Sequence, residues 1–294
     1  MAENDVLACV VSAMRTKLKQ RIVTGLLLAG SVIAAVTLLP LPALAVLFGL
    51  VVVIGTHEWS TLAGYRNWPL RVLYSLVAVL TMLMLYVYCE FGSTPPVAKL
   101  QPLFGLACLW WAIALLWIKA YPASGPLWGS KPMLGLMGLL VLLPPWLASL
   151  FLLSYEQGKL MLLGMVVLVA VADIGAYFSG RRFGRTKLAP RVSPGKSWEG
   201  VFGGLIACTL LAVAAHTGLG LEQPSLQAAI AIAMFGASAS VVGDLLESMV
   251  KRHRGVKDSG TLLPGHGGVL DRIDGITAAG PVVALGIILA GWSP

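Results

Sequence analysis

The chain has 294 residues, of which 57% are hydrophobic and only 12% are charged. Soluble domains usually carry about 25% charged residues, so this composition excludes an ordinary soluble protein and predicts an integral membrane protein. The formal net charge is +8. Because the basic residues lie between apolar runs, we interpret them as determinants of membrane topology, and no nucleic-acid partner is expected.

Residues 1–21 precede the first apolar run and are predicted to form an N-terminal leader. This stretch begins with the acidic residues Glu3 and Asp5, and its basic residues begin only at Arg15. Met14 is a candidate alternative start. A cleaved signal peptide is not expected, because the apolar run that follows is long and has no clear cleavage site.

Nine apolar runs are candidate membrane spans, since a helix needs about 20 residues to cross a bilayer core. They lie at 22–39, 43–56, 70–89, 102–118, 133–153, 159–179, 201–218, 226–247 and 275–292. The run 43–56 is short, and Pro144-Pro145 should kink or split the run 133–153. The sequence therefore predicts an all-α, polytopic transmembrane helix bundle of about nine spans. Residues 22–160 would form an N-terminal transmembrane bundle and residues 161–294 a C-terminal transmembrane region.

The distribution of basic residues predicts the orientation of the bundle. If the N-terminus is cytoplasmic, all 21 lysines and arginines except Lys99 and Lys159 fall on the cytoplasmic side. Such an asymmetry is typical of positive-inside topology. Two cytoplasmic loops, 180–200 and 250–274, are especially basic.

Several carboxylates lie close to the predicted cytoplasmic ends of the later spans. A carboxylate within a span is costly and usually faces the bundle interior or a wet cavity. For Asp173, an interfacial carboxylate neutralised by an arginine is the alternative interpretation. From Asp244 onward, polar residues recur at three- and four-residue spacing, which places them on one helix face. These residues are Asp244, Glu247, Ser248, Lys251 and Arg252.

The segment 257–274 combines a glycine-rich turn with carboxylates and bases. Glycines and a proline surround His266, so this stretch is not expected to be helical, and its backbone amides can approach an anion. Carboxylates suit Mg²⁺, which usually takes one or two of them together with substrate phosphates. Lysine and arginine beside them suit a triphosphate. The combination favours metal-assisted phosphoryl or nucleotidyl transfer at the membrane surface. The alternative is a positive-inside loop with a few compensating acids and a flexible turn.

The spacing of these residues resembles the signature of phosphatidate cytidylyltransferases, also called CDP-diacylglycerol synthases. The matching string is Ser248-x-Val250-Lys251-Arg252-x4-Lys257-Asp258-x-Gly260-x2-Leu263-Pro264-x-His266-Gly267-Gly268-Val269-x-Asp271-Arg272-x-Asp274. The resemblance extends upstream through Ala172-Asp173-x-Gly175-Ala176-Tyr177 and Ser193-Pro194-Gly195-Lys196-Ser197-Trp198-Glu199-Gly200. At Gly195 many members of the family have a second lysine. Residues 22–160 match only in apolar character and length.

This resemblance implies that CTP and phosphatidate react to give CDP-diacylglycerol and pyrophosphate, with Mg²⁺ as cofactor and a second cation left open. The residues expected to carry the reaction are Asp244, Lys251, Arg252, Lys257, Asp271 and Arg272. Those expected to bind substrate are Ser193, Lys196, Ser197, Ser248, His266, Gly267 and Gly268. The expected metal ligands are Asp244, Asp271 and Asp274. His266 would bind phosphate or order the loop rather than act as a base.

The resemblance also favours a multi-pass protein of the cell inner (plasma) membrane. Its active site would be cytoplasmic, membrane lipids would surround it, and a homodimer is consistent with the family. A CTP-dependent lipid or polyprenol kinase is one alternative, but it should lack the full His-Gly-Gly-x-x-Asp-Arg string. A membrane transporter is another, and it predicts internal repeats and acids near mid-bilayer. The sequence Gly195-Lys196-Ser197 is not interpreted as a Walker A loop, because Pro190 occupies the required glycine position.

Overall fold

The computed structural model describes residues 23–27, 29–91, 97–263, 265 and 267–292. The predicted leader, residues 1–21, and His266 lie outside these described residues. Within the described part of the chain, eight helices are long and apolar enough to cross a membrane. They are α2 (Leu41–Leu62), α3 (Trp68–Tyr88), α4 (Val97–Ala120), α6 (Lys131–Leu153), α7 (Gly158–Phe183), α8 (Trp198–Gly218), α9 (Leu226–Arg254) and α10 (Leu270–Leu289). The other elements are a shorter apolar helix, Val23–Leu38, the short helix α5 (Gly125–Trp128), and the strands β1 (Lys187–Ala189) and β2 (Ser193–Ser197).

This architecture confirms the predicted all-α, polytopic transmembrane bundle. Nine spans were expected, whereas the described residues form eight full-length helices and one shorter apolar helix. The run at 43–56 is part of a 22-residue helix, α2, which starts directly after Pro40. Proline is well tolerated at the first turn of a helix, so α2 can begin at Leu41 with Pro42 in its first turn. Of the two outcomes predicted for Pro144-Pro145, a kink or a split, the split is wrong, since α6 is helical from Lys131 to Leu153.

Both polar loops are shorter than the predicted ranges 180–200 and 250–274. Helix α7 continues to Phe183 and α8 begins at Trp198, and a two-stranded antiparallel hairpin fills most of the connection. Helix α9 continues to Arg254 and ends at Gly255, whose φ of 70° is the left-handed conformation typical of a helix C-terminus. Asp271, Arg272 and Asp274 therefore lie in the first turns of α10 and not in the loop before it.

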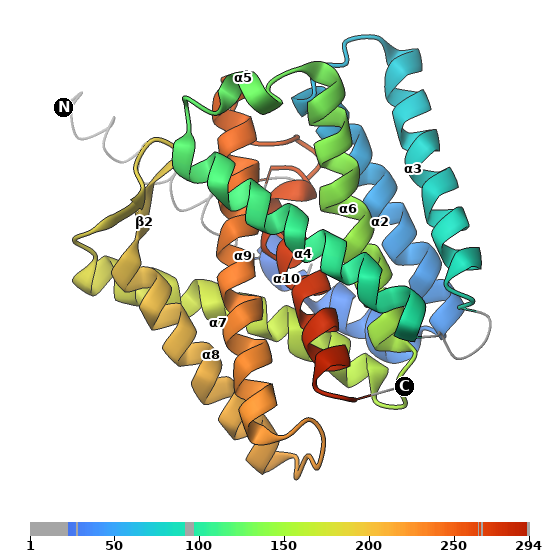
Figure 1. Ribbon diagram of the computed structural model, residues 1–294, viewed down its shortest axis with the longest axis vertical. Coiled ribbons are helices and arrows are strands. Elements are labelled where there is room, and N and C mark those ends of the chain that lie inside the picture. Colours follow the sequence, from blue (N-terminus) through green and yellow to red (C-terminus); the bar gives the residue numbers. More distant parts are fainter. Residues whose placement is uncertain (1–22, 28, 92–96, 264, 266, 293–294) are drawn as a thin grey trace, which may run out of the picture.

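The helices form a bundle in which α6 and α10 are central (Figure 1). Of the most apolar stretch of α6, 78% is buried, compared with 17% for α3 and for α8. Helix α6 therefore forms the interior, whereas few residues of α3 and α8 are buried and both helices lie at the edge of the bundle (Figure 1). Figure 1 shows α2, α3, α6 and α9 running roughly upright, while α7 crosses the lower part of the bundle.

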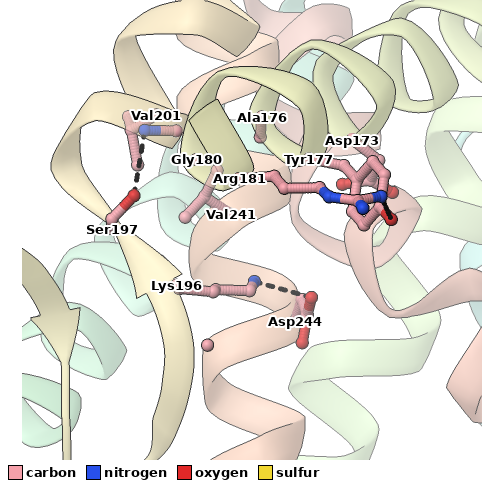
Figure 2. A pocket seen from close by; sticks show the side chains of 12 residues that line it. Asp173, Ala176, Tyr177, Gly180, Arg181, Lys196, Ser197, Val201, Val241 and Asp244 are labelled. Carbon is pink, nitrogen blue, oxygen red and sulfur yellow. Dashed lines mark hydrogen bonds and ion pairs between the residues drawn. The ribbon is translucent and has the colours of Figure 1, made fainter. Parts of the chain in front are cut away.

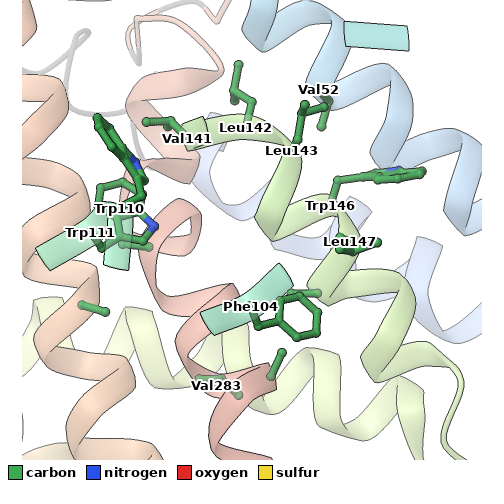
Figure 3. Packing of buried hydrophobic residues seen from close by; sticks show 14 of the residues in the cluster. Val52, Phe104, Trp110, Trp111, Val141, Leu142, Leu143, Trp146, Leu147 and Val283 are labelled. Carbon is green, nitrogen blue, oxygen red and sulfur yellow. The ribbon is translucent and has the colours of Figure 1, made fainter. Parts of the chain in front are cut away.

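Large apolar side chains from α4 and α6 fill the core between α2 and α10 (Figure 3). Phe104 of α4 and Phe151 of α6 are fully buried, with their ring centroids 5.7 Å apart. Two buried polar groups also bond to the backbone of α6. Trp59 donates to the Leu134 carbonyl at 2.7 Å, and Tyr74 donates to the Gly135 carbonyl at 2.8 Å. These bonds hold α2 and α3 against α6, the buried helix of the bundle.

Small residues hold α7 and α8 together. A Cβ added at Gly204 would lie 2.7 Å from the Ala172 carbonyl oxygen, and one added at Gly175 would lie 2.9 Å from the Gly203 carbonyl oxygen. Only glycine allows the two backbones to approach this closely, as is common between membrane helices. This contact positions the hairpin and the start of α8 beside the polar end of α7.

Candidate active site

A cavity of about 360 Å³ opens between α7, α8, α9 and strand β2 (Figure 2). Its charged lining consists of Asp173, Arg181, Lys196 and Asp244. Lys196 of β2 and Asp244 of α9 point toward one another and form an ion pair with an Nζ–Oδ2 distance of 2.6 Å. The cavity thus brings together Lys196 of the predicted loop 180–200 and Asp244 of the polar face predicted from the spacing on α9.

The β1–β2 hairpin is anchored to the start of α8, which fixes the position of Lys196. The Ser197 hydroxyl accepts a hydrogen bond from Gly200 N at 3.2 Å and caps α8. The Glu199 carboxylate accepts one from Thr186 N at 3.0 Å. Ser193 begins β2 and pairs with Ala189. Of the three serines predicted to bind substrate, Ser197 therefore already serves as a helix cap.

The polar face predicted from Asp244 onward is confirmed on α9. Ser248 Oγ donates to Asp244 Oδ1 at 3.2 Å, and Lys251 Nζ lies 3.0 Å from Glu247 Oε1. Each pair is separated by one helical turn, as expected for residues four apart. Arg252 is exposed, and its Nε donates to the Val192 carbonyl at 3.4 Å. The bases at the end of α9 therefore reach both the hairpin and α10.

Helices α9 and α10 approach each other closely beside the cavity. A Cβ added at Gly243 would overlap the Asp274 carbonyl oxygen. This close approach brings Asp274 near enough to interact electrostatically with Asp244, Lys196 and Lys251. Asp173 of α7 likewise interacts with Lys196 and Asp244. The site therefore consists of carboxylates from three helices with lysines between them.

Four donor groups from three residues contact the Asp271 carboxylate, and together they use both of its oxygens. Its Oδ1 lies 2.6 Å from Lys251 Nζ. Its Oδ2 accepts hydrogen bonds from Ser259 N and Ser259 Oγ, both at 2.9 Å, and from Gly268 N at 2.8 Å. Asp271 thus ties the glycine-rich loop to α9. In this arrangement, its oxygens are less available to a metal ion than those of Asp244 and Asp274.

The remaining predicted residues lie around this centre. Lys257 and Arg272 are exposed, and neither has an ion-pair partner within the described ranges. Gly267 has a φ of 82° and exchanges two backbone hydrogen bonds with Leu263, which close a tight turn. This turn presents Gly268 N to Asp271. The expected role of His266 stays a prediction.

Glu58 of α2 is a residue that the sequence reasoning missed. It is only 7% exposed. It contacts Ser259, Val269 and Leu270, more than 200 residues away in the chain. These residues belong to the connection between α9 and α10, residues 255–269, and to the first residue of α10; we call this connection the signature loop. The predicted span 43–56 ended two residues before Glu58, so Glu58 was not recognised as a charge within a span. A lone carboxylate at the end of an apolar run was the available signal, because such groups usually have a defined partner.

The carboxylates suit a Mg²⁺ ion that is held jointly with a substrate. Among the residues that the structure describes, no group of three or more His, Cys, Asp or Glu side chains is placed to hold a metal alone. Mg²⁺ usually takes only one or two protein carboxylates, together with substrate phosphates and water. Asp244 and Asp274 lie on adjacent helices, close enough to interact electrostatically, and together would supply two carboxylates.

Comparison with known proteins agrees with the signature. The family model described as "Cytidylyltransferase family" matches residues 19–289, nearly the whole chain. A phosphatidate cytidylyltransferase of Pseudomonas aeruginosa is 45% identical over 275 residues, which cover 94% of this chain and 98% of that protein. One of Haemophilus influenzae is 40% identical over 277 residues, with 90% and 96% covered. One of Brucella melitensis is 52% identical over 119 residues, with 38% and 41% covered. The chain belongs to the cytidylyltransferase family.

Proposed function

We propose that this protein is a phosphatidate cytidylyltransferase, which converts CTP and phosphatidate to CDP-diacylglycerol and pyrophosphate. The observation that carries the proposal is the cavity in which Lys196 pairs with Asp244, the first residue of the polar face of α9. The names of the full-length relatives support the same substrates. The cavity lies at one end of apolar helices, where a lipid phosphate and a soluble nucleotide can meet.

In the proposed reaction, an oxygen of the phosphatidate phosphate attacks the α-phosphorus of CTP. A new P–O–P bond forms, the bond from the α-phosphorus to the oxygen bridging the β-phosphorus breaks, and pyrophosphate leaves. A phosphate monoester is already largely ionised near neutral pH, because its second pKa is about 6. The protein therefore needs no general base, and positioning and charge stabilisation would dominate the catalysis.

The described residues divide this work between them. Lys196 and Lys251 lie beside the carboxylates and would neutralise charge on the reacting phosphates. Arg252, Lys257 and Arg272 are exposed around the site and would bind the outer phosphates of CTP. Asp244 and Asp274, with Asp271 Oδ1 as a third candidate ligand, would hold Mg²⁺. A bound Mg²⁺ would supply Lewis-acid stabilisation of the phosphate oxygens.

The proposal includes the location of the reaction. The asymmetry of the basic residues supports a multi-pass protein of the inner (plasma) membrane with this cavity on the cytoplasmic side. Arg181 and Lys196 in the cavity would attract an anionic lipid. Labelling of single cysteines from outside sealed cells tests the sidedness, and sedimentation in detergent tests the homodimer.

The decisive experiment uses purified protein, phosphatidate vesicles, Mg²⁺ and CTP labelled at either the α- or the γ-phosphorus. Cytidylyl transfer places the α-label in the lipid fraction and the γ-label in pyrophosphate. A CTP-dependent kinase would instead place the γ-label in the lipid. Absence of lipid label with both forms of CTP, from folded protein, would contradict the proposed function. Asp244→Asn is the matched inactive variant, since it removes the charge at the centre of the cavity.

A further inference from the structure

Glu58 is a buried carboxylate that the proposed reaction does not use. Glu58 is 7% exposed, and Glu247 is similarly buried at 4%. Glu247 has a cationic partner in Lys251, whereas Glu58 has no ion pair within the described ranges. Burial of an ionised carboxylate is costly unless hydrogen bonds satisfy it. The contacts of Glu58 therefore need an explanation.

Three donors from the signature region surround this carboxylate. Val269 N donates to Glu58 Oε1 at 2.9 Å, and Leu270 N donates to Oε2 at 2.9 Å. Ser259 Oγ lies 3.2 Å from the same Oε2. Val269 and Leu270 begin α10, so Glu58 accepts N–H groups that have no partner inside the helix. A negative charge is also favourable at a helix N-terminus.

The glycines of the loop fit around Glu58. A Cβ added at Gly260 would lie 2.7 Å from Glu58 Oε1, and one added at Gly268 would lie 2.5 Å from Glu58 Oε2. Real Cβ atoms do not approach an oxygen this closely, so any larger residue would displace either the loop or the carboxylate. The loop is therefore built around Glu58, although the two are separated by about 200 residues of chain.

Ser259 connects Glu58 to the proposed catalytic groups. The Ser259 hydroxyl has one hydrogen and two carboxylate acceptors, Glu58 Oε2 at 3.2 Å and Asp271 Oδ2 at 2.9 Å. Asp271 in turn holds Lys251 Nζ at 2.6 Å. A continuous chain of contacts thus runs from α2 through the loop and α10 to the lysine of α9.

We propose that Glu58 is a positioning residue for cytidylyl transfer. Its carboxylate fixes the N-terminus of α10 and, through Ser259, holds Asp271 and Lys251 in place beside the cavity. This inference rests on the proposed function. The competing explanation is that Glu58 is a helix cap that contributes only to folding.

The test compares Glu58→Gln with the parent protein by thermal unfolding and steady-state kinetics. Glutamine keeps the shape but places an amide NH2 against a backbone N–H, so one hydrogen bond is lost. The positioning role predicts a kcat about 10- to 100-fold lower per folded molecule, as expected when a hydrogen bond to a charged group is lost. The KM for phosphatidate should stay within about twofold, because Glu58 does not line the cavity. Glu58→Asp keeps the charge and should restore part of the lost kcat.

The matched control is Thr56→Val on the same helix. Thr56 is fully buried and bonds to Val53 O and Ser75 Oγ, away from the signature loop. Its loss should lower the melting temperature without changing kcat. If Glu58→Gln behaves in the same way, Glu58 is only a folding element and the inference is overturned.

Ser259→Ala provides a second test if Glu58→Gln does not fold. It leaves the bonds from Glu58 to Val269 and Leu270, and the bond from Ser259 N to Asp271, in place, and removes only the hydroxyl that bridges Glu58 and Asp271. A reduced kcat supports the inference, and a kcat equal to that of the parent refutes it. An inactive parent protein would instead refute the proposed function, so the two failures are distinguishable.

Discussion

Lys196 of the β1–β2 hairpin and Asp244 of α9 form a 2.6 Å ion pair in the lining of the cavity. Their side chains are 26% and 34% exposed, so solvent reaches the pair. Exposed ion pairs usually contribute only about 0–1 kcal/mol to stability. The pair is therefore better suited to hold the lysine in place for an incoming phosphate than to stabilise the fold.

Replacement of this lysine tests that role. Lys196→Ala should lower kcat/KM for CTP by about 10- to 100-fold, because a charge-assisted contact to phosphate is lost. The melting temperature should barely change. Lys187→Ala, on the exposed part of the same hairpin, is the control and should retain full activity. Parent-like kinetics in Lys196→Ala would show that the hairpin lysine does not contact substrate.

Metal dependence tests the carboxylates of α9 and α10. Chelation should abolish activity, and added Mg²⁺ should restore it. Asp244→Asn and Asp274→Asn should each lower kcat by at least about 100-fold, since metal ions supply several kcal/mol of charge stabilisation. Binding of Mn²⁺, followed by electron paramagnetic resonance with CTP present, should weaken in both variants. Glu156 is exposed and lies in the connection between α6 and α7, so Glu156→Gln is the control and should bind Mn²⁺ like the parent. Unchanged Mn²⁺ binding in Asp274→Asn would assign the ion to other ligands.

The close approach of α9 and α10 gives a separate prediction. Gly243→Ala places a methyl group against the Asp274 carbonyl oxygen, so the helices must separate. Overpacking of this kind usually costs about 1–3 kcal/mol, and here it should also reduce activity by moving Asp274 away from Asp244. Gly105→Ala on α4 is the control, because a Cβ there meets nothing within 4 Å. The melting temperature and kcat should both fall in Gly243→Ala and stay unchanged in Gly105→Ala. Full turnover in Gly243→Ala would mean that the spacing of the two helices is not critical.

Arg272 tests the contribution of the exposed bases. Arg272→Ala should raise the KM for CTP, and the salt dependence of KM should weaken, because one charge that attracts the triphosphate is removed. Stability should change by less than about 0.5 kcal/mol, as is usual for exposed sites. Arg66→Ala, at another exposed arginine, serves as the comparison. If the KM for CTP depends on salt identically in the parent, Arg272→Ala and Arg66→Ala, Arg272 is excluded from the nucleotide site.

The sequence was sufficient to predict the bundle and the polar face of α9. Apolar runs define membrane helices because the bilayer satisfies no backbone polar groups, and this constraint is local. The three- and four-residue spacing of Asp244, Ser248 and Lys251 is also a local property, so it could be read directly from the sequence.

Features that depend on distant contacts could not be predicted in the same way. The start of α10 was assigned after Asp274, because charges and glycines were assumed to mark the loop. In the structure, the Glu58 carboxylate accepts N–H groups at Val269 and Leu270, and the helix begins there. The engagement of Asp271 with Ser259 and Gly268 likewise depends on the folded loop. Residue types alone therefore identified Asp271 but not its partners.

The length of α9 determines the depth at which the chemistry would take place. At 1.5 Å per residue, its 29 residues extend about 44 Å, whereas the hydrocarbon core is about 30 Å thick. Asp244 lies ten residues before the end at Arg254, about 15 Å along the helix axis. If the excess length emerges at that end, Asp244 lies at the level of the lipid headgroups. A phosphatidate molecule could then react without leaving its leaflet, with its acyl chains beside the helices and its phosphate already at the height of the ion pair.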